Sequence, residues 1–189
     1  KDAINGKWIN SPGIELLDSL KSSLNLKSLP IIAEDLGIIT DDVNNLRDKF
    51  NLPGMKILQF AFDGIEDNPY LPENIINNNC VVYTGTHDNS TTYSWWENLD
   101  EFIKKKIFEK YNFSKNPSWN LIEIGMQTNS KLFVAPLQDI LSLDNSCRLN
   151  TPGTIHNNWR WKYNKSLNKL SENIIKYGSL GQSYSRGNS

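Results

Sequence analysis

The sequence predicts an α/β fold built on a parallel sheet, and two observations support this prediction. Four short apolar segments are continuous rather than alternating, which is typical of strands buried on both faces. These segments are residues 29–33, 55–62, 80–84 and 131–135. Amphipathic stretches precede, separate and follow them, and we expect helices at residues 14–22, 41–50, 99–111, 118–128 and about 165–177. A repeated strand–helix order favours parallel strands joined by right-handed crossovers.

The first four predicted helices have a start signal or an apolar face. Residues 14–22 follow Pro12 and Gly13, and residues 41–50 follow Thr40, a residue type that favours the N-cap position. The next two helices place large apolar residues three and four positions apart, so each has one face to bury.

Composition excludes several classes of protein. Hydrophobic residues make up 38% and charged residues 22% of the 189 residues, which is enough apolar material for a core and excludes a disordered chain. The net charge of −1 argues against a nucleic-acid partner or a polybasic membrane contact. The apolar runs are too short to cross a bilayer. The two cysteines, Cys80 and Cys147, are too few for a disulfide framework, which favours a reducing compartment.

Polar residues follow three of the predicted strands, at the end of a parallel sheet where ligands bind. The first is Glu34, directly after an apolar run. A carboxyl group among apolar neighbours can keep its proton near neutral pH, as a general acid must. Asp35 is expected to point the opposite way in extended chain. An equally good interpretation is that Glu34 and Asp35 cap the turn that follows.

His87 and Asp88 follow the third predicted strand, after Gly85, which allows close approach of the backbone to a neighbour. Asp88 is suited to stabilise a developing cation, and His87 to donate a hydrogen bond to a sugar hydroxyl or orient a carboxylate. A metal site is the competing interpretation, but the chain has two His and no ligand spacing accompanies them. The other alternative is that Asp88 caps a helix beginning near Asn89.

Aromatic residues are numerous and suit either a core or the apolar faces of sugar rings. They include Trp8, Phe60, Phe62, Tyr70, Trp95, Trp96, Trp159 and Trp161. We expect most of them in the core, and Trp8, in a loop beside Gly6, outside it. The sequence has no glycine-rich phosphate loop and no nucleophile elbow, so neither a nucleotide cofactor nor a serine hydrolase is expected.

Several segments together resemble one family, the 4-α-glucanotransferases, also called amylomaltases or disproportionating enzymes, which are related to the α-amylases. The segments are NGKW (5–8), SPG (11–13), IAEDLG (32–37), LPGMKILQFAF (52–62), NPYLP (68–72), VYTGTHDN (82–89), RLNTPGT (148–154) and NWRW (158–161). The resemblance extends from residue 1 to about residue 177 and is highly specific.

The resemblance implies a (β/α)₈ barrel with a retaining mechanism, of which this chain would be the C-terminal part, about strands five to eight. It implies that Glu34 is the general acid/base and Asp88 the carboxylate that stabilises the transition state. His87, Phe60, Asp63, Asn150 and Trp8 would contact the glucan. The substrates would be maltooligosaccharides and α-glucans, with no cofactor and no metal, in the cytoplasm or a plastid.

The sequence departs from the family pattern in three ways. Ser90 stands where members often carry a carboxylate. Residues 178–189 do not resemble the end of the family and are expected to form a disordered extension of the folded part, residues 1–177. The family's nucleophilic Asp belongs to the strand before Trp8, so we expect it upstream of Lys1, and Asp2 does not match it.

Two rival functions remain open on sequence. An α-glucan hydrolase of the same barrel type would carry similar residues, because transfer and hydrolysis differ in the exclusion of water and the binding of an acceptor. A non-catalytic glucan-binding module would need no acidic residue at the preceding strand end.

Overall fold

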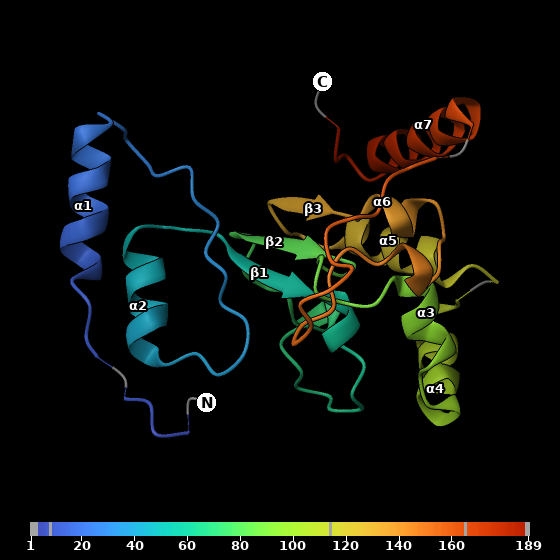
Figure 1. Ribbon diagram of the computed structural model, residues 1–189, viewed down its shortest axis with the longest axis horizontal. Helices are drawn as coiled ribbons and strands as arrows, with labels where there is room; N and C mark the ends of the chain where they lie inside the picture. Colours follow the sequence, from blue (N-terminus) through green and yellow to red (C-terminus); the bar gives the residue numbers. More distant parts are fainter. Residues whose placement is uncertain (1–3, 8, 114, 165, 188–189) are drawn as a thin grey trace. The chain divides into compact units, whose positions relative to one another are not determined.

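The computed structural model describes residues 4–7, 9–113, 115–164 and 166–187 (Figure 1). The chain divides into two compact units, Lys1–Gly54 and Met55–Ser189, which are described separately. Trp8 lies outside the described residues. Among the residues described, no helix combines the length and apolar character that crossing a membrane requires.

The first unit contains two helices, α1 (Gly13–Ser23) and α2 (Asp41–Lys49), close to the predicted ranges. Thr40 occupies the N-cap position of α2, as predicted, although its side chain makes no capping hydrogen bond. Acidic residues in the first turn of α2 and basic residues in its last turn complement the helix dipole. Neither helix has a buried residue.

The prediction of a strand at residues 29–33 is wrong for the described chain, where this segment has no regular secondary structure. The backbone amide of Ala33 donates one hydrogen bond, to the carbonyl of Pro53 at 2.8 Å. A strand requires a ladder of such bonds with a neighbour. An apolar run alone therefore does not decide strand formation.

The second unit is built on a three-stranded sheet of β1 (Gly54–Ile57), β2 (Cys80–Tyr83) and β3 (Leu132–Val134), in the order β1-β2-β3. Strands β2 and β3 are parallel, with Val82 opposite Phe133. This confirms the parallel α/β prediction. The strand expected at residues 55–62 stops at Ile57, because the chain turns into the 3₁₀ helix η1 (Leu58–Phe60).

Three helices connect β2 to β3, namely α3 (Thr92–Glu97), α4 (Glu101–Tyr111) and α5 (Pro117–Gln127) (Figure 1). The side chain of Asp100 accepts from the first amides of α4, and that of Asn116 accepts from Trp119 in α5. These contacts satisfy amides that have no partner within the helix. The short helix α3 was not predicted, since six residues are too few to show helical periodicity.

Two hydrophobic clusters form the core of this unit, and α5 contributes to both. Leu121 and Ile124 pack in the cluster beneath β2, whereas Trp119 and Ile122 pack in the second. The second cluster also includes Ile140, from the short helix α6 (Leu137–Ile140), and partly buried residues of the last helix, α7 (Leu167–Ser183). Two more 3₁₀ helices, η2 (Pro72–Asn74) and η3 (Asn145–Cys147), lie in loops.

The C-terminal segment differs from the predicted disordered extension over residues 178–189. Helix α7 continues to Ser183, and Gly181 is buried. The guanidinium of Arg186 then donates to the backbone carbonyls of Met126, Thr128 and Ser130. The expectation of disorder is therefore wrong for the residues described, up to 187, because this arginine supplies donors to carbonyls at the end of α5.

Candidate active site

The turn after β2 carries the predicted His87 and Asp88. Thr84 follows the strand directly and is fully buried. A Cβ atom at Gly85 would lie 2.7 Å from Nε2 of Gln59, so the backbone approaches this side chain closely at the glycine, as the sequence suggested. The Asn89 side chain accepts from the Thr86 amide at 2.8 Å and shapes the turn.

Asp88 is half-exposed and lies among polar partners from the 148–150 loop. Its Oδ1 accepts a hydrogen bond from Nδ2 of Asn150 at 2.6 Å and lies 3.3 Å from Nε2 of His87. Arg148 donates to the backbone carbonyls of both Asp88 and Asn150. The structure thus brings together three predicted site residues, His87, Asp88 and Asn150. The first two are adjacent in the sequence, and Asn150 is 62 positions after Asp88.

Trp159 adds an aromatic ring to this group. Its ring centroid lies 4.8 Å from that of His87, and 62% of the residue is exposed. Its backbone adopts a φ of 61°, which is rare for a bulky residue, and its amide donates to the Leu149 carbonyl. Trp159 is therefore an aromatic residue that lies outside the core. Phe62 is buried, as expected for most of the aromatic residues.

The helix-capping interpretation of Asp88 is wrong. The next helix, α3, begins at Thr92, and its N-cap is Thr91, whose hydroxyl accepts from the Ser94 amide. The Asp88 carboxylate is left facing Asn150 and His87. Its position is therefore not explained by capping of α3.

A buried carboxylate lies behind the turn. Asp139 on α6 is 1% exposed and accepts hydrogen bonds from the hydroxyl of Thr84 and from the amide and hydroxyl of Thr92. Burial raises the pKa of Asp139, and the hydrogen bonds from these threonines oppose that rise. Its position shortly after β3 is the one signal in the sequence that could have identified it.

Phe60 and Asp63 follow the C-terminal end of β1, the strand that neighbours β2 in the sheet. Phe60 is exposed and packs edge-on against Tyr70, with ring centroids 5.6 Å apart. Asp63 is exposed, and hydrogen bonds from the Asn68 side chain and the Ile65 amide lower its pKa. Gln59 connects this region to the His87 turn. Its backbone amide donates to the Thr84 carbonyl, and its side-chain amide donates to the Ser90 carbonyl.

Glu34 belongs to the first unit and is exposed, whereas the carboxylate of the neighbouring Asp35 contacts Arg47. The Asp35 carboxylate is 8% exposed and lies 2.5 Å from the Arg47 guanidinium. A Cβ atom at Gly54 would lie 2.3 Å from this carboxylate, so the backbone passes very close to it. The capping interpretation of Glu34 and Asp35 is wrong, because α2 begins after Thr40.

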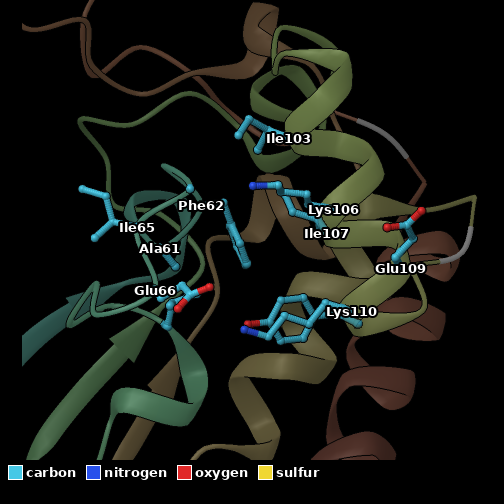
Figure 2. A pocket seen from close by; sticks show the side chains of 12 residues that line it. Ala61, Phe62, Ile65, Glu66, Ile103, Lys106, Ile107, Glu109 and Lys110 are labelled. Carbon is cyan, nitrogen blue, oxygen red and sulfur yellow. The ribbon is translucent and has the colours of Figure 1, made fainter.

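A separate cavity of about 420 Å³ lies between residues 61–66 and α4. Figure 2 shows Phe62 and Ile65 on one side, with Ile103, Lys106 and Lys110 on the other. None of the predicted site residues that the structure describes lines it. Within the described part of the chain, no three His, Cys, Asp or Glu side chains form a group that could hold a metal ion.

Comparison with solved structures defines the class of protein. An amylomaltase from Streptococcus agalactiae, solved in complex with acarbose, matches all of this chain and 38% of its own, with a TM-score of 0.89 and 31% identity. An amylomaltase from Corynebacterium glutamicum shares the fold at a TM-score of 0.57 and 18% identity, over 83% of this chain and 29% of its own. The chain thus has the α/β architecture of part of an amylomaltase.

Sequence comparison defines the family. The family model described as 4-alpha-glucanotransferase matches residues 1–168, and the chain belongs to that family. A 4-alpha-glucanotransferase of Synechocystis is 47% identical over 86% of this chain and 32% of its own length. The chloroplastic/amyloplastic 4-alpha-glucanotransferase DPE1 of Arabidopsis thaliana is 42% identical over 95% of this chain and 33% of its own. The chain spans about a third of the length of these curated relatives.

Proposed function

We propose that this chain supplies the acid/base and the transition-state-stabilising carboxylate of an enzyme that transfers α-1,4-glucan segments between maltooligosaccharides. The observation that carries the proposal is the accessible Asp88 carboxylate, placed after β2 and oriented by Asn150 in a chain of this family. An accessible, oriented negative charge at a strand end is suited to stabilise an oxocarbenium-like transition state.

The proposed reaction has two steps. In the first, a carboxylate nucleophile attacks the anomeric carbon while Glu34 protonates the glycosidic oxygen, so that the leaving glucan departs as an alcohol. In the second, Glu34 takes the proton from the hydroxyl of an acceptor sugar, which attacks the same carbon and releases the nucleophile. Asp88 faces the positive charge that develops in both steps.

The proposed architecture is the C-terminal half of a (β/α)₈ barrel, about strands five to eight. The nucleophilic Asp would come from a strand that precedes Lys1. The relatives are about three times as long as the match, which leaves room for the other strands.

His87, Phe60, Asp63, Asn150 and Trp8 are proposed to contact the glucan. The exposed ring of Trp159 beside His87 offers a further flat apolar surface, and sugar rings stack on such surfaces. We place the activity in the cytoplasm or in a plastid, and the plant relatives with chloroplastic/amyloplastic names support the second location.

Incubation of the full-length protein with maltotriose tests this function. Transfer predicts glucose together with longer maltooligosaccharides, separated by chromatography, with little change in total reducing ends. A rise in reducing ends in step with bond cleavage would instead show hydrolysis. Binding of maltooligosaccharide without any product would show a glucan-binding module.

Residues 1–189 alone provide the matched control. We expect no transfer, because retaining chemistry needs two carboxyl groups roughly 5–5.5 Å apart, and the second is proposed to lie before Lys1. Poor solubility is also expected, since unpaired strand edges and exposed apolar side chains favour aggregation. Turnover comparable to the full-length protein would contradict the proposed origin of the nucleophile.

A further inference from the structure

Asp139 is a buried ionisable group that the proposed reaction does not use. Its Oδ2 accepts from the hydroxyls of Thr84 and Thr92 at 2.6 and 2.7 Å, and its Oδ1 accepts from the Thr92 amide at 2.7 Å. Burying a carboxylate is costly unless hydrogen bonds replace its hydration. Three short hydrogen bonds from two residues meet that requirement.

The two donors bracket the His87 turn. Thr84 is the residue directly after β2, and Thr92 is the first residue of α3. One carboxylate thus fixes both ends of the segment 85–91, which carries His87 and Asp88. Asp139 itself is 1% exposed, so it reaches the turn from behind and does not share the solvent-exposed side of Asp88.

Other contacts fix the same segment from independent directions. Gln59 donates to the Ser90 carbonyl at 3.0 Å, and Asn145 accepts from the Thr91 amide at 3.0 Å. Arg148 donates to the Asp88 carbonyl on the exposed side. Among these partners Asp139 is the one whose side chain accepts hydrogen bonds from residues at both ends of the turn.

We infer that Asp139 is a positioning residue for Asp88, which acts by fixing Thr84 and Thr92 at the two ends of the turn. This inference rests on the proposed function, in which the Asp88 carboxylate must face the anomeric carbon. Asp139 does not touch the substrate. A shift of about 1 Å in a catalytic group can cost about 100-fold in rate, so a fixed turn has a direct effect on turnover.

The first test is Asp139→Asn in the full-length protein. The amide keeps the size of the side chain but places an NH₂ group against the donors of Thr84 or Thr92. We expect kcat on maltotriose, per folded molecule, to fall by about tenfold to 100-fold, with KM changed by less than about twofold. Asp100→Asn is the matched control, because Asn caps a helix about as well as Asp and kcat should stay unchanged.

A second pair of variants changes the donor, Thr92, instead of the acceptor, Asp139. This pair tests the inference even if Asp139→Asn fails to fold. Thr92→Val removes the hydroxyl donor while preserving shape, and Thr92→Ser retains the donor. We expect Thr92→Val to lower kcat and Thr92→Ser to restore most of it. Equal kcat per folded molecule in Thr92→Val and in the wild type would overturn the inference.

Hydrogen exchange of the backbone amides gives a readout that does not depend on activity. We expect residues 85–91 to exchange faster in Asp139→Asn than in the wild type and in Asp100→Asn, with the β2 amides less affected. Unchanged exchange in 85–91 would overturn the inference even if activity fell. A wild-type protein that shows no transfer would overturn the proposed function, while the exchange comparison would still test the role of Asp139.

Discussion

The two proposed catalytic carboxylates are held in different ways. Asp88 lies on a turn whose ends are fixed by neutral and charged hydrogen bonds from a packed core. Glu34 lies in a segment without regular secondary structure, in a unit whose helices bury no residue, and the contact described beside it is the ion pair of Asp35 with Arg47.

This difference shows two ways of holding a carboxylate in place. Around Asp88 the position depends on many contacts, so the loss of one leaves the others. Beside Glu34 the described contact is the ion pair of Asp35 with Arg47, which itself depends on two side chains. We therefore expect substitutions near Glu34 to affect local order more than comparable substitutions near Asp88.

The largest effect is expected for Glu34→Gln in the full-length protein. Loss of the proton donor should reduce transfer from maltotriose by about 10²–10⁴-fold, because the leaving sugar oxygen must then depart unprotonated. Chromatography of the products at fixed enzyme concentration measures this. A transfer rate close to that of the wild type would show that Glu34 is not the acid/base, and the comparison with Asp88 would then no longer concern two catalytic carboxylates.

Asp88→Asn should reduce kcat by about 10²–10³-fold, since the transition state loses its counter-charge. The change is nearly isosteric, so the melting temperature and the affinity for maltooligosaccharides should stay close to those of the wild type. Thermal unfolding and ligand titration check both. A large fall in stability with a proportionate loss of activity would show that Asp88 is mainly structural.

A smaller effect should separate the two carboxylates that contact Arg47. The side chain of Asp35 is 8% exposed and that of Asp48 is 61% exposed. Asp35→Asn should lower the free energy of unfolding by about 1–3 kcal/mol, the range for weakening a buried hydrogen-bonded charge. Asp48→Asn should change it by less than about 0.5 kcal/mol, as is usual for exposed ion pairs. Equal effects in urea denaturation would show that burial does not distinguish them.

The smallest effect concerns the exposed Glu73. Burial opposes ionisation of Glu73, but hydrogen bonds from Lys110 and Tyr111 outweigh it and lower the pKa of Glu73. A lowered folded-state pKa contributes stability above the unfolded pKa of about 4.3, and this is lost as pH falls through the folded value. Glu73→Gln should therefore lower the melting temperature slightly at pH 7 and less at pH 3.

The control for this prediction is Lys110→Met. In that background the effect of Glu73→Gln at pH 7 should shrink, because part of the interaction is already absent. A difference in melting temperature that stays the same from pH 7 to pH 3 would contradict the assignment of the pKa shift to these partners.

Much of the fold and part of the site could be predicted from the sequence, because the signals are local. Continuous apolar runs gave strands at β2 and β3, and helical spacing located α2, α4 and α5 within a few residues. His87 and Asp88 were found because they lie in the turn that follows a predicted strand. These patterns depend on neighbours in the chain, which the sequence shows directly.

Tertiary structure decided what distant residues do to one another. Segment 29–33 has an apolar run much like that of β2, yet only β2 has a partner in the described sheet, and a strand exists only with a partner. Asp139 connects to Thr84 across 55 positions and Arg148 reaches Asp88 across 60. No local pattern encodes such hydrogen bonds, because they depend on how the core brings separate loops together.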